Sequence, residues 1–219
     1  MKSFDRRWQK ATFLISTSLF LLTATPAFAH HPFGEKTPAN FFEGFLSGLG
    51  HPIIGLDHFA IVVSIGLLAA VHSRGIFIPI AFLITAMFGT GIHLTGASIP
   101  GVELFVTGSI LLFGLLLVML DRFNLKLLIG LAAIAGLFHG YAYGEAIFGA
   151  SMSPLIAYLL GFTVIQLVVS LAAFAIAKAV TQQKLESSAK LRSAGFVIFG
   201  IGLAFFASQL IAIALPIAE

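Results

Sequence analysis

Apolar residues run along this chain in long blocks separated by short polar segments. Six blocks of about 19 to 24 residues are each long enough to cross a hydrocarbon layer of about 30 Å as an α-helix. A shorter apolar block at 39–50 is interrupted by glycines and predicts an interfacial or re-entrant helix. Because backbone groups in lipid must hydrogen-bond internally, the pattern predicts an all-α polytopic membrane protein. The six transmembrane helices are expected at 52–71, 76–98, 102–120, 125–148, 154–177 and 194–215.

The N-terminal segment differs from these blocks, because its apolar run is short and follows a basic stretch. Residues 1–10 carry four basic side chains. The apolar run after them has about 14 residues, fewer than the ~20 that a span needs. An Ala-Phe-Ala sequence ending at Ala29 then gives the small-x-small pattern of a cleavage site. We predict a cleaved signal peptide at 1–29 and one six-helix membrane domain at 30–219, beginning with His30.

Composition supports a membrane protein over a soluble one. The 219 residues are 58% hydrophobic and 10% charged, with a mean hydropathy of +1.04. A soluble domain carries roughly 25% charged residues, so the bilayer is the expected solvent of this chain. The chain has no cysteine, which excludes disulfides and thiolate metal ligands.

The placement of basic residues predicts the orientation in the membrane. If the mature N-terminus lies outside, the inner loops hold seven Lys and Arg residues and the outer segments hold only Lys36. This asymmetry accounts for the net charge of +3 without nucleic-acid binding. We expect a multi-pass protein of the bacterial inner membrane with both mature termini outside the cytoplasm. The spans before and after Asp121 begin on opposite sides, which is compatible with an inverted three-plus-three arrangement.

Ionisable residues within the spans gather toward the outer side. The first span opens with HPIIGLDH, which places His51 at the outer mouth and Asp57 and His58 one to two turns deeper. His93 lies near the outer end of the second span. The fourth span ends with FHGYAYGE, which contains His139 and a glutamate. Because ionisable groups are costly in lipid, such a gathering indicates a site or a pathway.

Imidazole and carboxylate together suit a borderline divalent transition metal such as Ni²⁺, Co²⁺ or Zn²⁺. Cu(I) would require Cys or Met clusters, and Mg²⁺ would require oxygen ligands. Pro52 and Gly55 interrupt the first span, and a broken helix can aim several side chains at one ion. The amine and imidazole of the predicted mature N-terminus can capture metal outside. The candidate metal residues are His30, His51, Asp57, His58, His93, His139 and Glu145.

The fourth span also carries a structural alternative. Gly136, Gly140 and Gly144 recur every four residues, a small-residue stripe that lets a neighbouring helix approach closely. His139 lies beside this stripe and can face the first span. It can equally serve packing, with its ring hydrogen-bonded to a backbone carbonyl, so the pattern leaves both roles open.

Two motifs resemble the HupE/UreJ family of bacterial nickel/cobalt permeases. One is a histidine, five residues and Asp-His in the first span, and the other is Phe-His-Gly in the fourth. The family pattern continues Ala-His-Gly-x-Glu. Here Tyr143 replaces the second histidine and Glu145 comes one residue early, so metal contact by these two residues stays open. The resemblance covers the whole chain and implies Ni²⁺ or Co²⁺ uptake that supplies hydrogenase or urease.

We therefore expect a secondary permease, facilitated or ion-coupled, rather than an enzyme. Ni²⁺ or Co²⁺ is the expected substrate, and no permanently bound cofactor is expected; the chain has no Gly-x-x-x-x-Gly-Lys loop for ATP. The expected partners are the metal ion and lipid, and a homo-oligomer is compatible with the sequence. Two alternatives are a haem-binding b-type cytochrome and an intramembrane metal-dependent hydrolase. The hydrolase is disfavoured because H-E-x-x-H and Gly-x-Ser-x-Gly motifs are absent.

Overall fold

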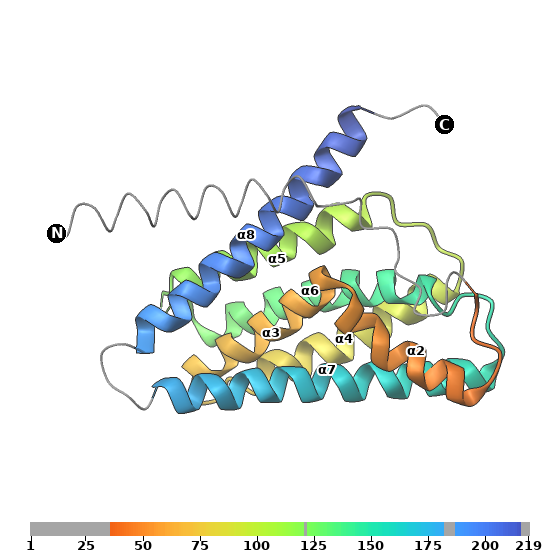
Figure 1. The fold of residues 1–219 in the computed structure, drawn as a ribbon, viewed down its shortest axis with the longest axis horizontal. Helices are drawn as coiled ribbons and strands as arrows, with labels where there is room; N and C mark the ends of the chain where they lie inside the picture. Colours follow the sequence, from red (N-terminus) through yellow and green to blue (C-terminus); the bar gives the residue numbers. More distant parts are fainter. Residues whose placement is uncertain (1–35, 121, 182–186, 216–219) are drawn as a thin grey trace.

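The computed structural model describes residues 36–120, 122–181 and 187–215, and this part of the chain is all-helical (Figure 1). The predicted signal peptide and His30 lie outside the described residues. Most of the helices lie side by side in one elongated bundle, with α8 crossing it diagonally. The helices are α2 (Phe41–Ile54), α3 (Leu56–Val71), α4 (Phe77–Leu94), α5 (Val102–Val118), α6 (Leu125–Glu145), α7 (Met152–Thr181) and α8 (Ser187–Ala214).

Helix length and exposure fit a multi-pass membrane protein. By length and composition, α4, α6, α7 and α8 can each cross a membrane, and the bent pair α2–α3 makes a fifth span if it counts as one. The apolar helix α5, with 17 residues, is shorter. Large apolar side chains such as Phe88 and Val197 point outward, as expected for surfaces that face lipid. The all-helical membrane fold is supported, whereas the count of six spans stays a prediction.

The first predicted span is divided differently in the structure. We expected a short helix at 39–50 and a span from residue 52, but α2 continues to Ile54 and the break falls at Gly55. The two helices meet there at an angle of 78°. Helix α2 passes through Pro52 because it packs along α7, where a Cβ on Gly48 would overlap the Tyr158 carbonyl oxygen. This contact between α2 and α7 stabilises the helical turn at Pro52, which proline disfavours.

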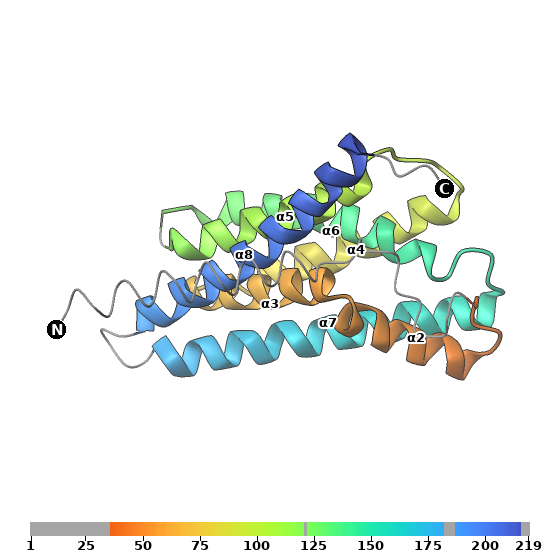
Figure 2. The same cartoon turned by 45° about the horizontal axis from the view of Figure 1, so that its top comes forward.

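Small residues hold the helices together in close pairs. Figure 2 shows α2 and α3 following α7 along its length, and α4 pairs with α6 and α5 with α8. The predicted glycine stripe of α6 does allow close approach, and the neighbour is α4. Carbonyl groups of Phe82 and Ala86 lie where side chains of Gly136 and Gly140 would be. His139 lies on α6 beside this stripe, and its side chain reaches that of His58 on α3.

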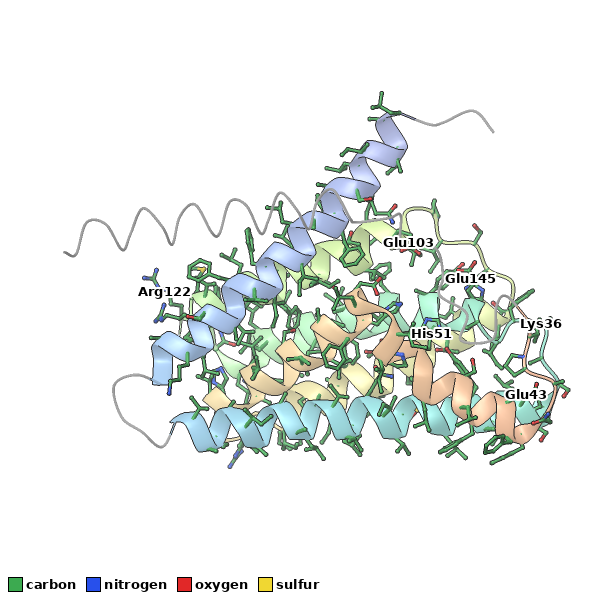
Figure 3. The ribbon with its side chains drawn as sticks, viewed as in Figure 1. Lys36, Glu43, His51, Glu103, Arg122 and Glu145 are labelled. Carbon is green, nitrogen blue, oxygen red and sulfur yellow. The ribbon has the colours of Figure 1, made fainter. Side chains whose placement is uncertain are left out.

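The two ends of the bundle differ in charge. Glu43, Glu103 and Glu145 lie at one end with Lys36, whereas Arg122 lies at the opposite end (Figure 3). We call these the acidic end and the basic end. The other basic residues of the described chain apart from Lys36 lie at the same end as Arg122, because the loop joining α3 to α4, the start of α6, the end of α7 and the start of α8 all lie there. They are Arg74, Lys126, Lys178, Lys190 and Arg192.

The α4–α6 contact gives a test of the packing. Gly140→Ala should destabilise the protein by about 1–3 kcal/mol, because its Cβ would overlap the Ala86 carbonyl oxygen and force the helices apart. Gly130→Ala is the matched control on the same helix, since nothing lies within 4 Å of the position of its Cβ. The midpoint of thermal unfolding in detergent measures the difference. Equal midpoints for the two variants would contradict the close packing.

Candidate metal centre

Three buried histidines meet where the α2–α3 break faces α6. His51 lies in the last turn of α2, His58 in the first turn of α3 and His139 within α6, with 3%, 8% and 0% of their surfaces exposed. The Nδ1 atoms of His58 and His139 are 3.0 Å apart. The His51 ring lies 5.3 Å from the His58 ring between centroids. Figure 3 places His51 inside the bundle near the break. We call these three residues the histidine cluster.

The hydrogen bonds around His139 are consistent with a proton on its Nε2 atom. The Ser109 hydroxyl of α5 donates to the Val106 carbonyl oxygen at 2.7 Å. The same hydroxyl oxygen lies 2.9 Å from Nε2 of His139, so it accepts a hydrogen bond from Nε2–H. A neutral His139 then presents the Nδ1 lone pair to His58, which donates its own Nδ1–H across the 3.0 Å gap. In this arrangement the Nδ1 atom of His139 faces the Nδ1 atom of His58.

Tyr143 is a fourth member of this region. Its ring is fully buried, with centroids 4.5 Å from His58, 5.3 Å from His51 and 6.3 Å from His139. Within the described residues, its hydroxyl has no hydrogen-bond partner. Sequence analysis left its role open. The signal available was its spacing of four residues from His139, which places both on one face of a helix.

Asp57 is buried beside the cluster and serves the start of α3. Its Oδ1 accepts a hydrogen bond from the His58 backbone N–H at 2.8 Å. A carboxylate in the first turn also interacts favourably with the helix dipole. Its charge acts on Tyr143 and Glu103 as well, which places negative potential between the cluster and the acidic end. Asp57 therefore stabilises the start of α3 and also supplies negative potential beside the histidine cluster.

The remaining candidates lie at the acidic end and do not join the histidine cluster. The His93 side chain packs against Gly144, and its ring lies 4.6 Å from that of Tyr141. Glu145 is exposed at the end of α6, and its charge acts on His93 and Glu103. We call His93, Glu103 and Glu145 the entrance group. In the part of the chain that the structure describes, no three His, Asp or Glu side chains are placed closely enough to hold a metal ion.

The helical bundle and its buried histidines define a polytopic membrane protein with a polar site within its apolar core. The chain belongs to the HupE / UreJ protein family, whose sequence profile matches residues 18–205. Protein HupE of Rhizobium leguminosarum bv. viciae is 32% identical over 154 residues, which cover 68% of this chain and 74% of the relative. No solved structure gives a significant match. The family predicted from the two motifs is therefore confirmed.

Proposed function

We propose that this protein is a secondary permease that imports Ni²⁺ or Co²⁺ through the histidine cluster. The observation that carries the proposal is the buried pair of Nδ1 atoms contributed by two different helices. Membership of the HupE/UreJ family supports it, since that family is associated with nickel and cobalt uptake for hydrogenase or urease. Neutral imidazole is a preferred donor for both ions.

The spacing of the pair suits a single ion. With metal–nitrogen bonds of about 2.1 Å, two imidazoles at 90° on one ion have donor atoms about 3.0 Å apart. His58 and His139 already have this separation, 3.0 Å, with a hydrogen bond in place of the ion. Binding of the metal ion then requires the imidazole rings of His58 and His139 to rotate and the proton on Nδ1 of His58 to be displaced. Trans ligands of a haem iron would be about 4 Å apart, which disfavours the cytochrome alternative for this pair.

The entrance group and the two charged ends support a direction of transport. Negative charge from Glu145 and Asp57 attracts cations toward the acidic end, and the cluster lies deeper in the bundle. The basic end corresponds to the cytoplasm under the positive-inside rule. An ion that enters between these carboxylates therefore reaches the cluster before it reaches the cytoplasm.

The helix pairing supports an alternating-access mechanism. An inverted repeat would relate α2–α3 to α6, α4 to α7 and α5 to α8. This exchange converts the observed pairing of α2–α3 with α7 into that of α6 with α4, and it maps the α5–α8 pair onto itself, although the packing of α3 against α5 has no counterpart of similar extent between α6 and α8. His58 and His139 lie on helices that the exchange would relate. Rocking of the two halves about this pair would then open the cluster first to one side and then to the other.

Uptake by purified protein tests the proposed function. Proteoliposomes should accumulate radiolabelled Ni²⁺ or Co²⁺ above the level of protein-free vesicles, and the unlabelled ion should compete. Mg²⁺ should not compete, because it favours oxygen ligands and retained water. Accumulation that does not exceed protein-free vesicles for either ion would refute the permease function.

Cysteine labelling tests the orientation. The natural chain has no cysteine, so Ser73→Cys and Ser98→Cys each introduce a single thiol. Both positions are exposed, Ser73 in the loop between α3 and α4 at the basic end and Ser98 between α4 and α5 at the acidic end. In intact spheroplasts, a membrane-impermeant maleimide should label only Ser98→Cys. The reverse pattern would place the entrance group in the cytoplasm and reverse the direction of transport.

A further inference from the structure

Gln166 is a buried polar residue that the histidine cluster does not use. Only 1% of its surface is exposed, and its Nε2 donates to the Phe162 carbonyl oxygen at 3.1 Å within α7. Its Oε1 is fully buried and has no hydrogen-bond partner among the described residues. A buried amide oxygen without a partner is costly, which makes Gln166 a position where a donor is expected.

Gln166 lies on the line that leads from the histidine cluster toward the basic end. The buried face of α7 carries Tyr158, Phe162, Gln166 and Ser170 at intervals of four residues. Tyr158 donates its hydroxyl to the Tyr143 carbonyl oxygen at 2.8 Å, and the Phe162 ring lies 5.6 Å from the Tyr143 ring. Since α7 runs toward the basic end, Gln166 follows Phe162 by about 6 Å along the helix axis.

Helix α3 covers the next turn of this face. A Cβ on Gly66 would overlap the Ser170 carbonyl oxygen, so α3 and α7 are in backbone contact one turn beyond Gln166. Gln166 therefore lies on α7 between Phe162, whose ring approaches that of Tyr143, and this contact. The α3–α7 contact would have to open before an ion could pass from Gln166 to the basic end along α7.

We propose that Gln166 forms an inner transit site for a hydrated divalent cation. The Oε1 atom accepts a hydrogen bond from a water molecule on the ion after the ion leaves the histidine cluster. A neutral amide oxygen binds such an ion more weakly than imidazoles do, and a weak second site allows release toward the cytoplasm. This inference rests on the proposed permease function and adds a residue to its path.

The test compares the maximal rate of Ni²⁺ uptake with equilibrium Ni²⁺ binding, because a transit site should affect the first and not the second. Gln166→Leu removes the acceptor at similar size, and it should lower the maximal Ni²⁺ uptake rate by about tenfold, as expected when one hydrogen bond is lost at the barrier. Equilibrium binding of Ni²⁺ to the detergent-solubilised protein should stay at the wild-type level. Thr163→Val is the control on the same helix, because the Thr163 hydroxyl already donates to the Leu159 carbonyl oxygen. Its uptake rate should be unchanged.

Each outcome decides the inference. A normal uptake rate in Gln166→Leu overturns it, and so does an equal loss of rate in Thr163→Val. If Gln166→Leu loses its fold, Gln166→Met replaces it as a variant of similar length without a carbonyl acceptor. A normal rate in Gln166→Met, or loss of fold in both variants, overturns the inference because the amide is then structural. Wild-type protein that neither binds nor transports Ni²⁺ refutes the permease function itself.

Discussion

Replacing His58 by glutamine is expected to reduce Ni²⁺ uptake by more than about 100-fold, the scale set by loss of a metal ligand rather than of its support. The substitution removes one of the two Nδ1 atoms that lie 3.0 Å apart and leaves His139 without its partner. Glutamine is close in size and retains hydrogen-bonding groups, so the helix break should persist. The measurement is initial uptake in proteoliposomes containing equal amounts of folded protein.

Asp57→Asn separates charge from structure at the same helix start. Asparagine keeps an oxygen that can accept from the His58 backbone N–H, now 2.8 Å from the Asp57 carboxylate. Loss of the negative charge should raise the Ni²⁺ concentration for half-maximal uptake while leaving the unfolding midpoint close to wild type. Normal uptake by His58→Gln, or a similar loss of folded protein in both variants, would show that these residues are structural and not a metal site.

Hydrophobic length predicted most of the helices well. The blocks expected at 76–98, 125–148 and 154–177 correspond to α4, α6 and α7, because a long apolar run in lipid has no alternative to helix. An interruption at Pro52 and Gly55 was predicted and the break falls at Gly55, but the continuation of α2 through Pro52 was not predicted. Local sequence favoured an end before Pro52, whereas contact of Gly48 with α7 extends the helix to Ile54. Such a contact is tertiary and leaves no mark in the local pattern.

The sequence singled out the buried histidines but did not show which of them lie together. Histidines in an apolar segment are conspicuous, so His51, His58 and His139 could be chosen from the sequence, and the structure brings them together. The sequence also placed His93 near the outer end of the second span and made it a candidate metal residue. The structure instead places that side chain against Gly144 at the acidic end, because residue depth says nothing about which face of a helix a side chain occupies.

The residues that contact the histidines, Ser109 and Tyr143, could not be identified as such from the sequence. Ser109 is one hydroxyl among many in apolar helices, and only the approach of α5 to α6 shows that it contacts His139. Tyr143 differs from the resembled motif, and its buried hydroxyl among three imidazoles becomes apparent only once α2, α3 and α6 meet. Contacts between helices distant in sequence therefore account for what was missed.

Ser109→Ala should weaken Ni²⁺ binding by about 10–100-fold, the usual effect of removing a hydrogen bond to a metal-ligating histidine. Without the hydroxyl oxygen, Nε2–H of His139 loses one of its acceptors, and the tautomer that presents the Nδ1 lone pair to the ion is less favoured. Because the ligands themselves remain, the maximal uptake rate should change less than the concentration for half-maximal uptake. Isothermal titration of the solubilised protein and concentration-dependent uptake measure the two quantities.

Ser64→Ala is the matched control for this variant. Ser64 is a fully buried helix serine and Ser109 is a half-buried one, and each hydroxyl donates to the carbonyl oxygen three residues earlier, that of Ser64 at Ile61 and that of Ser109 at Val106. Ser109→Thr keeps the hydroxyl and should restore most of the affinity lost in Ser109→Ala. Equal affinity losses in Ser64→Ala and Ser109→Ala would mean that the effect comes from packing. Unchanged affinity in Ser109→Ala would show that the tautomer of His139 does not control metal binding.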